Sequence, residues 1–319
     1  MSRIIRADDG FRVAWLHPRF WGAWFACGLV LLLACLPWFM QKRLGILLGW
    51  LAFCLVKPRV ADTRINLQLC FPDLDEPARE RLTRDVFREA GIGIFEAANA
   101  WFKPLRWQLR RVRVEGIDRV TEAARQGRGV IILGAHYSGL ELNGAMASQF
   151  FPLQVIYRPQ NNPVLDWLIR ARRRRTYVDQ IDHADMRTLF KALKRGDIVW
   201  TSVDQDFGLK QGVMAPFFGV PAATLTATSR MARINGSPVL FTQFFRNEDD
   251  TYTLRFTPVL DGYPSGDDVQ DATRMNAMLA QLIGEHPAQY MWFHRRFKSR
   301  PAGEPSPYAK KRKHRRVKP

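Results

Sequence analysis

VIILGAHYSGLE, residues 130–141, joins an apolar run to a turn that carries two ionisable side chains. The run Val130–Leu133 is short and lies between Gly129 and Gly134, which is typical of a buried strand. His136 therefore follows the carboxyl end of a predicted strand. Open α/β sheets place their ligands at this end of their strands. The stretch thus predicts both an α/β fold and the edge of the sheet where chemistry takes place.

The spacing of His136 and Glu141 restricts how the two side chains can meet. In one continuous helix they would lie about 140° apart around the axis. They can meet if His136 lies in the turn and Glu141 in the first turn of the next helix, which Gly134 and Gly139 would ease. Glu141 would then accept a hydrogen bond from one imidazole nitrogen and leave the other nitrogen free as a base. A hydrogen-bonded loop histidine beside a surface glutamate gives the same pattern, so the pair alone decides nothing.

Apolar runs and helical patterns alternate along the rest of the chain. This alternation indicates an α/β sandwich of a sheet and helices. Further strands are predicted at Gln154–Tyr157, Ile198–Ser202, Val239–Phe245 and Tyr252–Phe256. Helical patterns cover Glu76–Arg88, Gly91–Phe102, Pro163–Arg174, Met186–Lys194 and Ala223–Ile234.

The N-terminal region contains a run of 22 residues without a formal charge, Phe20–Gln41. A helix of about 20 apolar residues is long enough to cross a bilayer. Trp21, Trp24 and Trp38 lie near the ends of the run, where interfacial aromatic residues are common. We expect a retained membrane helix. A signal peptide is the alternative, although its apolar region would be shorter and a cleavage site of small residues would follow it.

Charge and composition divide the chain into three predicted parts. Residues 1–60 form a membrane-anchor region, residues 61–308 a single domain, and residues 309–319 a basic tail with seven Lys or Arg residues. The formal net charge of +18 favours acidic partners such as nucleic acid, an anionic membrane, an acidic carrier protein or a phosphorylated substrate. The four cysteines lie at positions 27, 35, 54 and 70 without metal-ligand or redox spacing.

Several segments, in one order along nearly the whole chain, resemble the late acyltransferases of lipid A biosynthesis, which are related to glycerolipid acyltransferases. The segments are HPRFW (17–21), LCFP (69–72), AWF (100–102), GAHYSGLELNGA (134–145), YRPQNNPVLDWL (157–168), KALKRGDIVW (191–200), VDQDFG (203–208), APFFG (215–219) and QYMWFHRRFKSRP (289–301).

This resemblance implies a mixed sheet flanked by helices and a catalytic dyad of His136 as general base and Glu141 as its orienter. It implies acyl–acyl carrier protein as donor and a Kdo-bearing lipid A precursor as acceptor. The accepting group would be the hydroxyl of a 3-hydroxyacyl chain. No cofactor or metal is implied. The enzyme would be anchored by its N-terminal region in the bacterial inner membrane, with its catalytic domain on the cytoplasmic side.

Five further residues are candidates for substrate binding. Arg158 follows a predicted strand and could bind a phosphate or an oxyanion, or form an ion pair with Asp204 or Asp206. Within the run of arginines from 170 to 175, Arg173 and Arg175 align best with the arginines of the family. Asp204 and Asp206 follow the strand at Ile198–Ser202 and could bind a sugar hydroxyl or an arginine.

An aromatic and basic strip lies near the C-terminus, with Tyr290, Trp292, His294, Arg295 and Arg296. It suits an anionic lipid headgroup, or ordinary packing with a basic face. His294 has no acidic residue nearby in the sequence, so it ranks below His136 as a base.

Three other functions are compatible with part of the pattern. A membrane-tethered nucleic-acid-binding protein would explain the charge, but the sequence contains no recognisable binding module. A thioesterase would use the same base with water in place of the hydroxyl. An acyltransferase for another polar lipid would differ only in its acceptor. The N-terminal region could also dip into one leaflet without crossing, since its flanking charges give no clear orientation.

Overall fold

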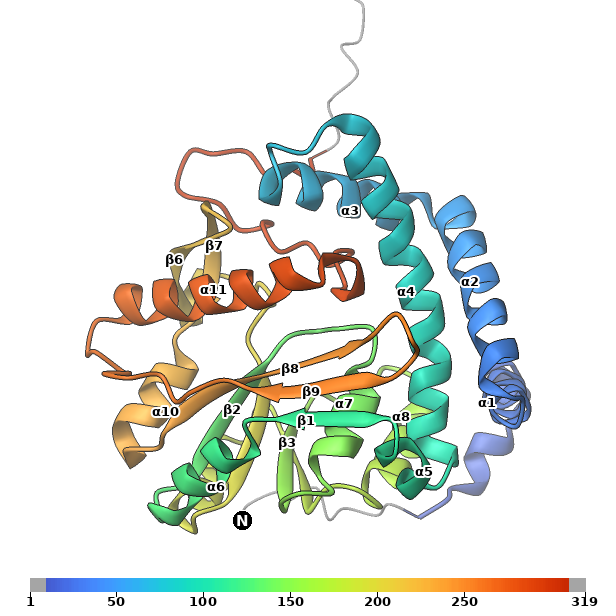
Figure 1. The fold of residues 1–319 in the computed structure, drawn as a ribbon, viewed down its shortest axis with the longest axis horizontal. Helices are drawn as coiled ribbons and strands as arrows, with labels where there is room; N and C mark the ends of the chain where they lie inside the picture. Colours follow the sequence, from blue (N-terminus) through green and yellow to red (C-terminus); the bar gives the residue numbers. More distant parts are fainter. Residues whose placement is uncertain (1–9, 310–319) are drawn as a thin grey trace, which may run out of the picture.

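The computed structural model describes residues 10–309, and the predicted basic tail lies outside this range except for Ala309. Within this range, seven strands form one sheet in the order β1-β9-β8-β2-β5-β3-β4 (Figure 1). Neighbouring strands are parallel except β8 and β9, so the sheet is mixed. The strands are β1 (Val112–Glu115), β2 (Val130–Gly134), β3 (Leu153–Tyr157), β4 (Asp179–Asp182), β5 (Ile198–Ser202), β8 (Val239–Arg246) and β9 (Tyr252–Phe256).

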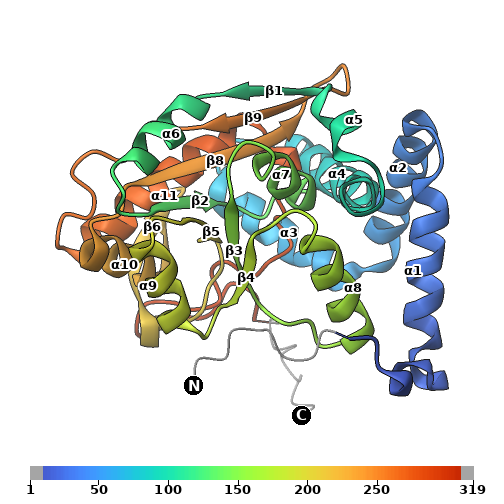
Figure 2. The same ribbon diagram turned by 90° about the horizontal axis from the view of Figure 1, so that it is seen from below.

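Helices and one hairpin surround this sheet (Figures 1 and 2). The α-helices are α1 (Trp21–Ala34), α2 (Trp38–Leu55), α3 (Lys57–Cys70), α4 (Glu76–Phe102), α5 (Leu105–Leu109), α6 (Ile117–Arg125), α7 (Leu140–Ala147), α8 (Pro163–Arg173), α9 (Met186–Lys194), α10 (Ala227–Asn235) and α11 (Asp268–Glu285). Short 3₁₀ helices are η1 (Val13–Leu16), η2 (Pro18–Phe20), η3 (Leu209–Gln211) and η4 (Pro287–Gln289). The hairpin pairs β6 (Gly212–Phe217) with β7 (Val220–Leu225).

Strand β2 lies between two apolar cores. Ile131 and Leu133 face one core, with residues of α9, α10 and α11, whereas Val130 and Ile132 face the other, with residues of α6 and α7. Successive side chains of a strand point to opposite faces, so a strand covered on both sides must be apolar throughout. This explains why Val130–Leu133 is a continuous apolar run.

The sequence-based elements agree with most of this fold. The mixed sheet flanked by helices is confirmed, and the predicted strands correspond to β2, β3, β5, β8 and β9. The two helical patterns between Glu76 and Phe102 form the single helix α4. The helix predicted at Ala223–Ile234 is wrong at its start, because Ala223, Thr224 and Leu225 pair with β6 in the hairpin. Strands β1, β4, β6 and β7 were not predicted.

The apolar run Phe20–Gln41 is not one continuous helix. Helix α1 ends at Ala34, and α2 begins after Pro37, which disfavours helical backbone in the residue before it. The buried amide of Gln41 donates to the carbonyls of Leu33, Ala34 and Leu36 and so satisfies the end of α1. Among residues 10–309 no single helix is long and apolar enough to cross a membrane. Helices α2 and α3 meet the test as a pair, but with a bend of 93° between them.

Helix α2 packs tightly along α4, on the side away from the sheet (Figures 1 and 2). Gly45 allows this approach, because a Cβ there would lie 2.7 Å from the Cα of Ile92. Gly49 faces the backbone of Phe87 in the same way. The N-terminal helices are therefore joined to the rest of the fold through close backbone contact. The division of the chain at residue 60 stays a prediction.

Candidate active site

His136 and Asp204 meet at the carboxyl edge of the sheet. Strands β2 and β5 are parallel neighbours, and each of the two residues follows one of them. Asp204 Oδ1 lies 2.8 Å from His136 Nδ1, and Asp204 Oδ2 accepts a hydrogen bond of 3.0 Å from the His136 backbone N–H. One buried carboxylate thus fixes both the ring and the backbone of the histidine.

The other ring nitrogen of His136 remains available for a proton. The Nε2 atom lies 3.3 Å from Nε2 of Gln205, an amide nitrogen that can only donate. This contact and the bond to Asp204 favour the tautomer with its proton on Nδ1. The His136 side chain is 20% exposed, whereas that of Asp204 is completely buried. When His136 is neutral, it therefore carries its proton on Nδ1 and presents Nε2 as the basic atom at a partly exposed place.

Charge and burial have opposite effects on the pKa values of His136 and Asp204. Burial lowers the pKa of His136, but the charge of Asp204 and its hydrogen bond outweigh burial and leave the pKa above its ordinary value. Burial raises the pKa of Asp204, but the imidazole beside it and the bonds from His136 lower this pKa to about 2. Asp204 is therefore ionised whenever His136 acts as a base.

Glu141 does not take the place expected for it beside His136. It lies in the first turn of α7, as predicted, but its carboxylate binds Arg173 through two hydrogen bonds and accepts a 2.9 Å bond from Trp101 Nε1. Burial raises the pKa of Glu141, but the guanidinium lowers it more, so the carboxyl is held ionised. Arg173 on α8 lies close enough to bind the carboxylate of Glu141, and Asp204 already binds Nδ1 of His136. The expected hydrogen bond between His136 and Glu141 is therefore replaced by one between His136 and Asp204.

The remaining predicted site residues lie in different surroundings. Arg158 follows β3 and is exposed at the carboxyl edge of the sheet. The ion pair considered for it is not formed, because Asp204 binds His136 and Asp206 accepts bonds from the backbone of Gly208 and Ser299 and from the Ser299 hydroxyl. Arg175 is exposed just beyond the end of α8.

His294 lies much closer to His136 than their distance in the sequence suggests. The centroids of the two rings are 5.4 Å apart. The strip between Gln289 and Arg296 runs beside the His136 turn, and the Met291 N–H donates to the His136 carbonyl. The sequence ranks His294 low because no acidic residue lies near it along the chain. The acidic neighbour of both histidines is Asp204, which only the order of the strands brings to them.

No three His, Cys, Asp or Glu side chains within residues 10–309 are placed to hold a metal ion.

Comparison with known proteins indicates the family of the whole chain. Residues 9–299 match the family described as bacterial lipid A biosynthesis acyltransferase. The chain is 38% identical to the lipid A biosynthesis palmitoleoyltransferase of Escherichia coli K12, over 93% of this chain and 98% of that protein. It is 37% identical to the lauroyltransferase of the same organism, with the same coverage of both chains. The myristoyltransferase is 28% identical, over 95% of this chain and 94% of its own length.

Proposed function

Because the chain belongs to the bacterial lipid A biosynthesis acyltransferase family, we propose that it moves a fatty acyl group from acyl–acyl carrier protein to a Kdo-bearing lipid A precursor. The acceptor is the hydroxyl of a 3-hydroxyacyl chain. Acyl transfer in lipid A biosynthesis follows from the family itself. The carrier protein and the Kdo-bearing acceptor rest on the resemblance of the motifs and on the positive charge of the chain.

The observation that carries the mechanism is the hydrogen bond between His136 Nδ1 and Asp204. His136 Nε2 withdraws the proton of the hydroxyl as its oxygen attacks the thioester carbonyl carbon. Asp204 orients the ring and stabilises the imidazolium that forms. The imidazolium then protonates the leaving thiolate, which yields an ester and a free carrier thiol.

Glu141 and Arg173 form a second ion pair. Their two hydrogen bonds join the first turn of α7 to the last turn of α8. A role of Glu141 in catalysis remains a prediction, and in this structure it would act through Arg173 instead of through a bond to the imidazole. Among residues 10–309 no carboxylate pairs with the exposed Arg158 or Arg175, and these two side chains suit the phosphate groups of the acceptor.

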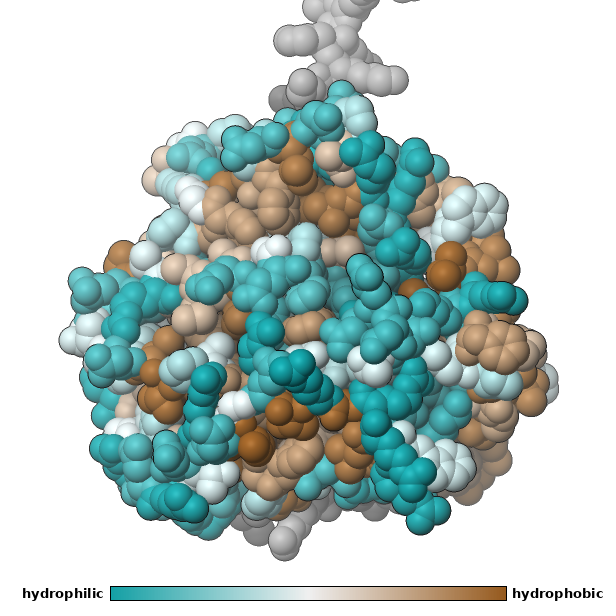
Figure 3. Space-filling view, in the orientation of Figure 1, coloured by the Kyte–Doolittle hydropathy of each residue, from teal (hydrophilic) through white to brown (hydrophobic). Residues whose placement is uncertain are grey.

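We further propose that α1 and α2 attach the enzyme to the cytoplasmic side of the inner membrane. Large apolar side chains of these helices are exposed, among them Trp21, Phe25, Leu32, Trp50 and Leu55. Figure 3 shows brown apolar surface at the right-hand edge, over these helices. A cytosolic carrier protein as donor requires the His136 site to face the cytoplasm.

The test uses purified protein, labelled lauroyl–acyl carrier protein and a Kdo-bearing lipid A precursor, with and without the lipid. We expect label to move into the lipid, and little free fatty acid to form when the lipid is present. If free fatty acid were released at the same rate with and without the lipid, the protein would be a thioesterase instead. Transfer to another glycolipid in preference to the Kdo-bearing precursor would overturn the proposed acceptor.

A further inference from the structure

His294 presents a second imidazole beside the base, and its ring has no hydrogen-bond partner among the residues that the structure describes. The two ring planes are inclined by 59° with 5.4 Å between their centroids. A reacting atom needs about 2.8–3.0 Å to each hydrogen-bonding nitrogen. The two rings are therefore close enough to act on one reacting centre, one imidazole on the attacking hydroxyl and the other on the carbonyl oxygen.

The backbone around His294 is held firmly in place. Asn66 on α3 donates from its side-chain amide to the carbonyls of Trp292 (2.5 Å) and His294 (2.7 Å). Arg59 on the same helix donates to the carbonyl of Phe293. These bonds connect the strip to α3 on one side, and the bond between Met291 and His136 connects it to the site on the other. A side chain on such a backbone is pre-organised for a role in the site.

Burial and the neighbouring positive groups favour the neutral form of the His294 ring. Burial, the neighbouring His136 and Arg59 lower the pKa of His294 to about 4, and Asp204 opposes this only in part. These groups reach the ring from α3, from the turn after β2 and from the end of β5. A neutral imidazole keeps one N–H to donate and adds no charge that would hinder proton uptake by His136.

We propose that His294 is a second catalytic residue, which donates a hydrogen bond to the thioester carbonyl oxygen as that oxygen becomes an oxyanion. This inference rests on the proposed acyl transfer. The hydroxyl oxygen bonds to the carbonyl carbon while its proton passes to His136 Nε2, and the carbonyl oxygen gains the negative charge that His294 stabilises. The carbon–sulfur bond then breaks, the oxyanion returns to a carbonyl, and the thiolate takes the proton from His136. A neutral imidazole is an effective electrophile in such a position.

The test compares His294→Ala and His294→Gln with the wild type in steady-state kinetics for both substrates. Loss of one oxyanion donor typically costs about 10²–10³-fold in kcat. We expect a loss of this size in His294→Ala with KM for the lipid unchanged, because the bond forms only in the transition state. The amide of His294→Gln should restore part of the rate. His183→Ala is the control, since His183 is an exposed histidine after β4 and pairs with Asp182; its kcat should stay within about twofold, as surface substitutions rarely affect a site.

Three results would overturn the proposal. A rise in KM for the lipid at constant kcat would make His294 part of acceptor binding. Unchanged kinetics would remove it from the reaction. Loss of the acid limb of the pH–rate profile in His294→Ala would make it the base in place of His136.

Hydrolysis of the donor without lipid is measured in parallel. It should fall by the same factor, because water attack forms the same oxyanion. A wild type that hydrolyses the donor but transfers nothing to the lipid would contradict the proposed function alone and leave this test of His294 intact. Thermal melting of each variant shows that it is folded.

Discussion

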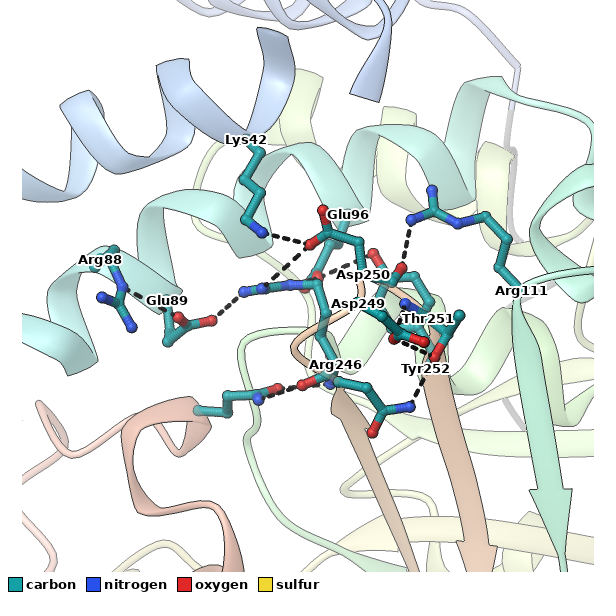
Figure 4. Close-up of polar contacts among 12 residues, drawn as sticks. Lys42, Arg88, Glu89, Glu96, Arg111, Arg246, Asp249, Asp250, Thr251 and Tyr252 are labelled. Atoms are coloured by element: carbon teal, nitrogen blue, oxygen red, sulfur yellow. Dashed lines mark hydrogen bonds and ion pairs between the residues drawn. The ribbon is translucent and has the colours of Figure 1, made fainter. Parts of the chain in front are cut away.

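The molecule contains two buried polar clusters that differ in how completely their charges are paired. The Arg246 cluster joins Arg246 on β8 to Glu89 and Glu96 on α4, and Tyr252 on β9 donates to Glu96 (Figure 4). The Arg246 side chain is 7% exposed, and both carboxylates are similarly buried. The His136 cluster contains one buried carboxylate, Asp204, beside two imidazoles, and the ring of His136 is partly open to solvent.

This difference separates a structural cluster from a chemical one. Arg246 lies between two carboxylates, and its backbone N–H binds Gln289. The cluster therefore connects α4 to the β8–β9 hairpin, and its main groups are occupied. In the His136 cluster the basic nitrogen has only the 3.3 Å contact with the Gln205 amide, and the His294 ring has no hydrogen-bond partner within the described residues. Groups that lack partners in the folded state are the ones that a substrate can engage.

The largest effect is expected from removal of the base. His136→Gln should lower the rate of acyl transfer by about 10²–10⁴-fold, the usual contribution of a general base. The unfolding free energy should change little, because a glutamine can keep a hydrogen bond with Asp204. Labelled transfer and urea denaturation measure the two quantities on the same preparation. Nearly full activity would show that another group withdraws the proton.

Arg246→Met should strongly lower the free energy of unfolding, in contrast to His136→Gln, which should mainly lower the rate of acyl transfer. Removing one partner of a buried ion pair typically costs about 3–5 kcal/mol, because it leaves uncompensated buried charge. Here Glu96 would lose its guanidinium, and Glu89 would keep only the half-exposed Arg88. Urea denaturation measures the loss. The control is Arg88→Met, since Arg88 also touches Glu89 but is about half exposed, and exposed pairs contribute about 0–1 kcal/mol.

A small loss in Arg246→Met, comparable to the control, would contradict the division between the two clusters. Restoration by an additional Glu89→Gln and Glu96→Gln change would support it, because the orphaned charges would then be absent.

Asp204→Asn should change the pH dependence of the reaction as well as its rate. The charge of Asp204 raises the pKa of His136, whereas burial lowers that pKa. His136 must be neutral to act as a base, so the rate rises as pH increases through this pKa. Without the carboxylate the pKa falls, and the acid limb of the profile should move to lower pH while the plateau rate drops. An acid limb that stays in place would show that Asp204 does not govern the titrating group.

The sequence does not identify Asp204 as the partner of His136, although it does predict the strand that Asp204 follows. Val130–Leu133 and Ile198–Ser202 are apolar because β2 and β5 are covered on both faces, and this pattern is visible in the residues alone. The order of the strands is not visible. His136 and Asp204 are 68 residues apart, and the order β2-β5 brings them together. Glu141 was the nearest carboxylate along the chain, but Arg173 on α8 binds it.

The path of the N-terminal helices also could not be predicted from the sequence alone. Hydropathy along Phe20–Gln41 is continuous, so the run resembles one membrane helix. The break at Pro37 depends on Gln41, whose amide satisfies the end of α1 and whose carbonyl oxygen accepts a bond from Asn99 on α4. A single polar residue at the end of an apolar run does not predict such a contact, because its partners lie on another helix.

The smallest effect is expected from the exposed edge of the Arg246 cluster. Lys42 on α2 binds Asp250 in the β8–β9 hairpin at 2.6 Å, and the two side chains are 30% and 25% exposed (Figure 4). Because both side chains are still partly open to water, Lys42→Met should cost only about 0.5–1 kcal/mol in urea denaturation. The difference from the wild type should shrink at 1 M salt, where the screening length falls to about 3 Å. A loss as large as that of Arg246→Met, and insensitive to salt, would place Lys42 within the buried cluster and make the attachment of α2 depend on charge. A small, salt-sensitive loss would leave the close packing of Gly45 and Gly49 against α4 as the main attachment of α2.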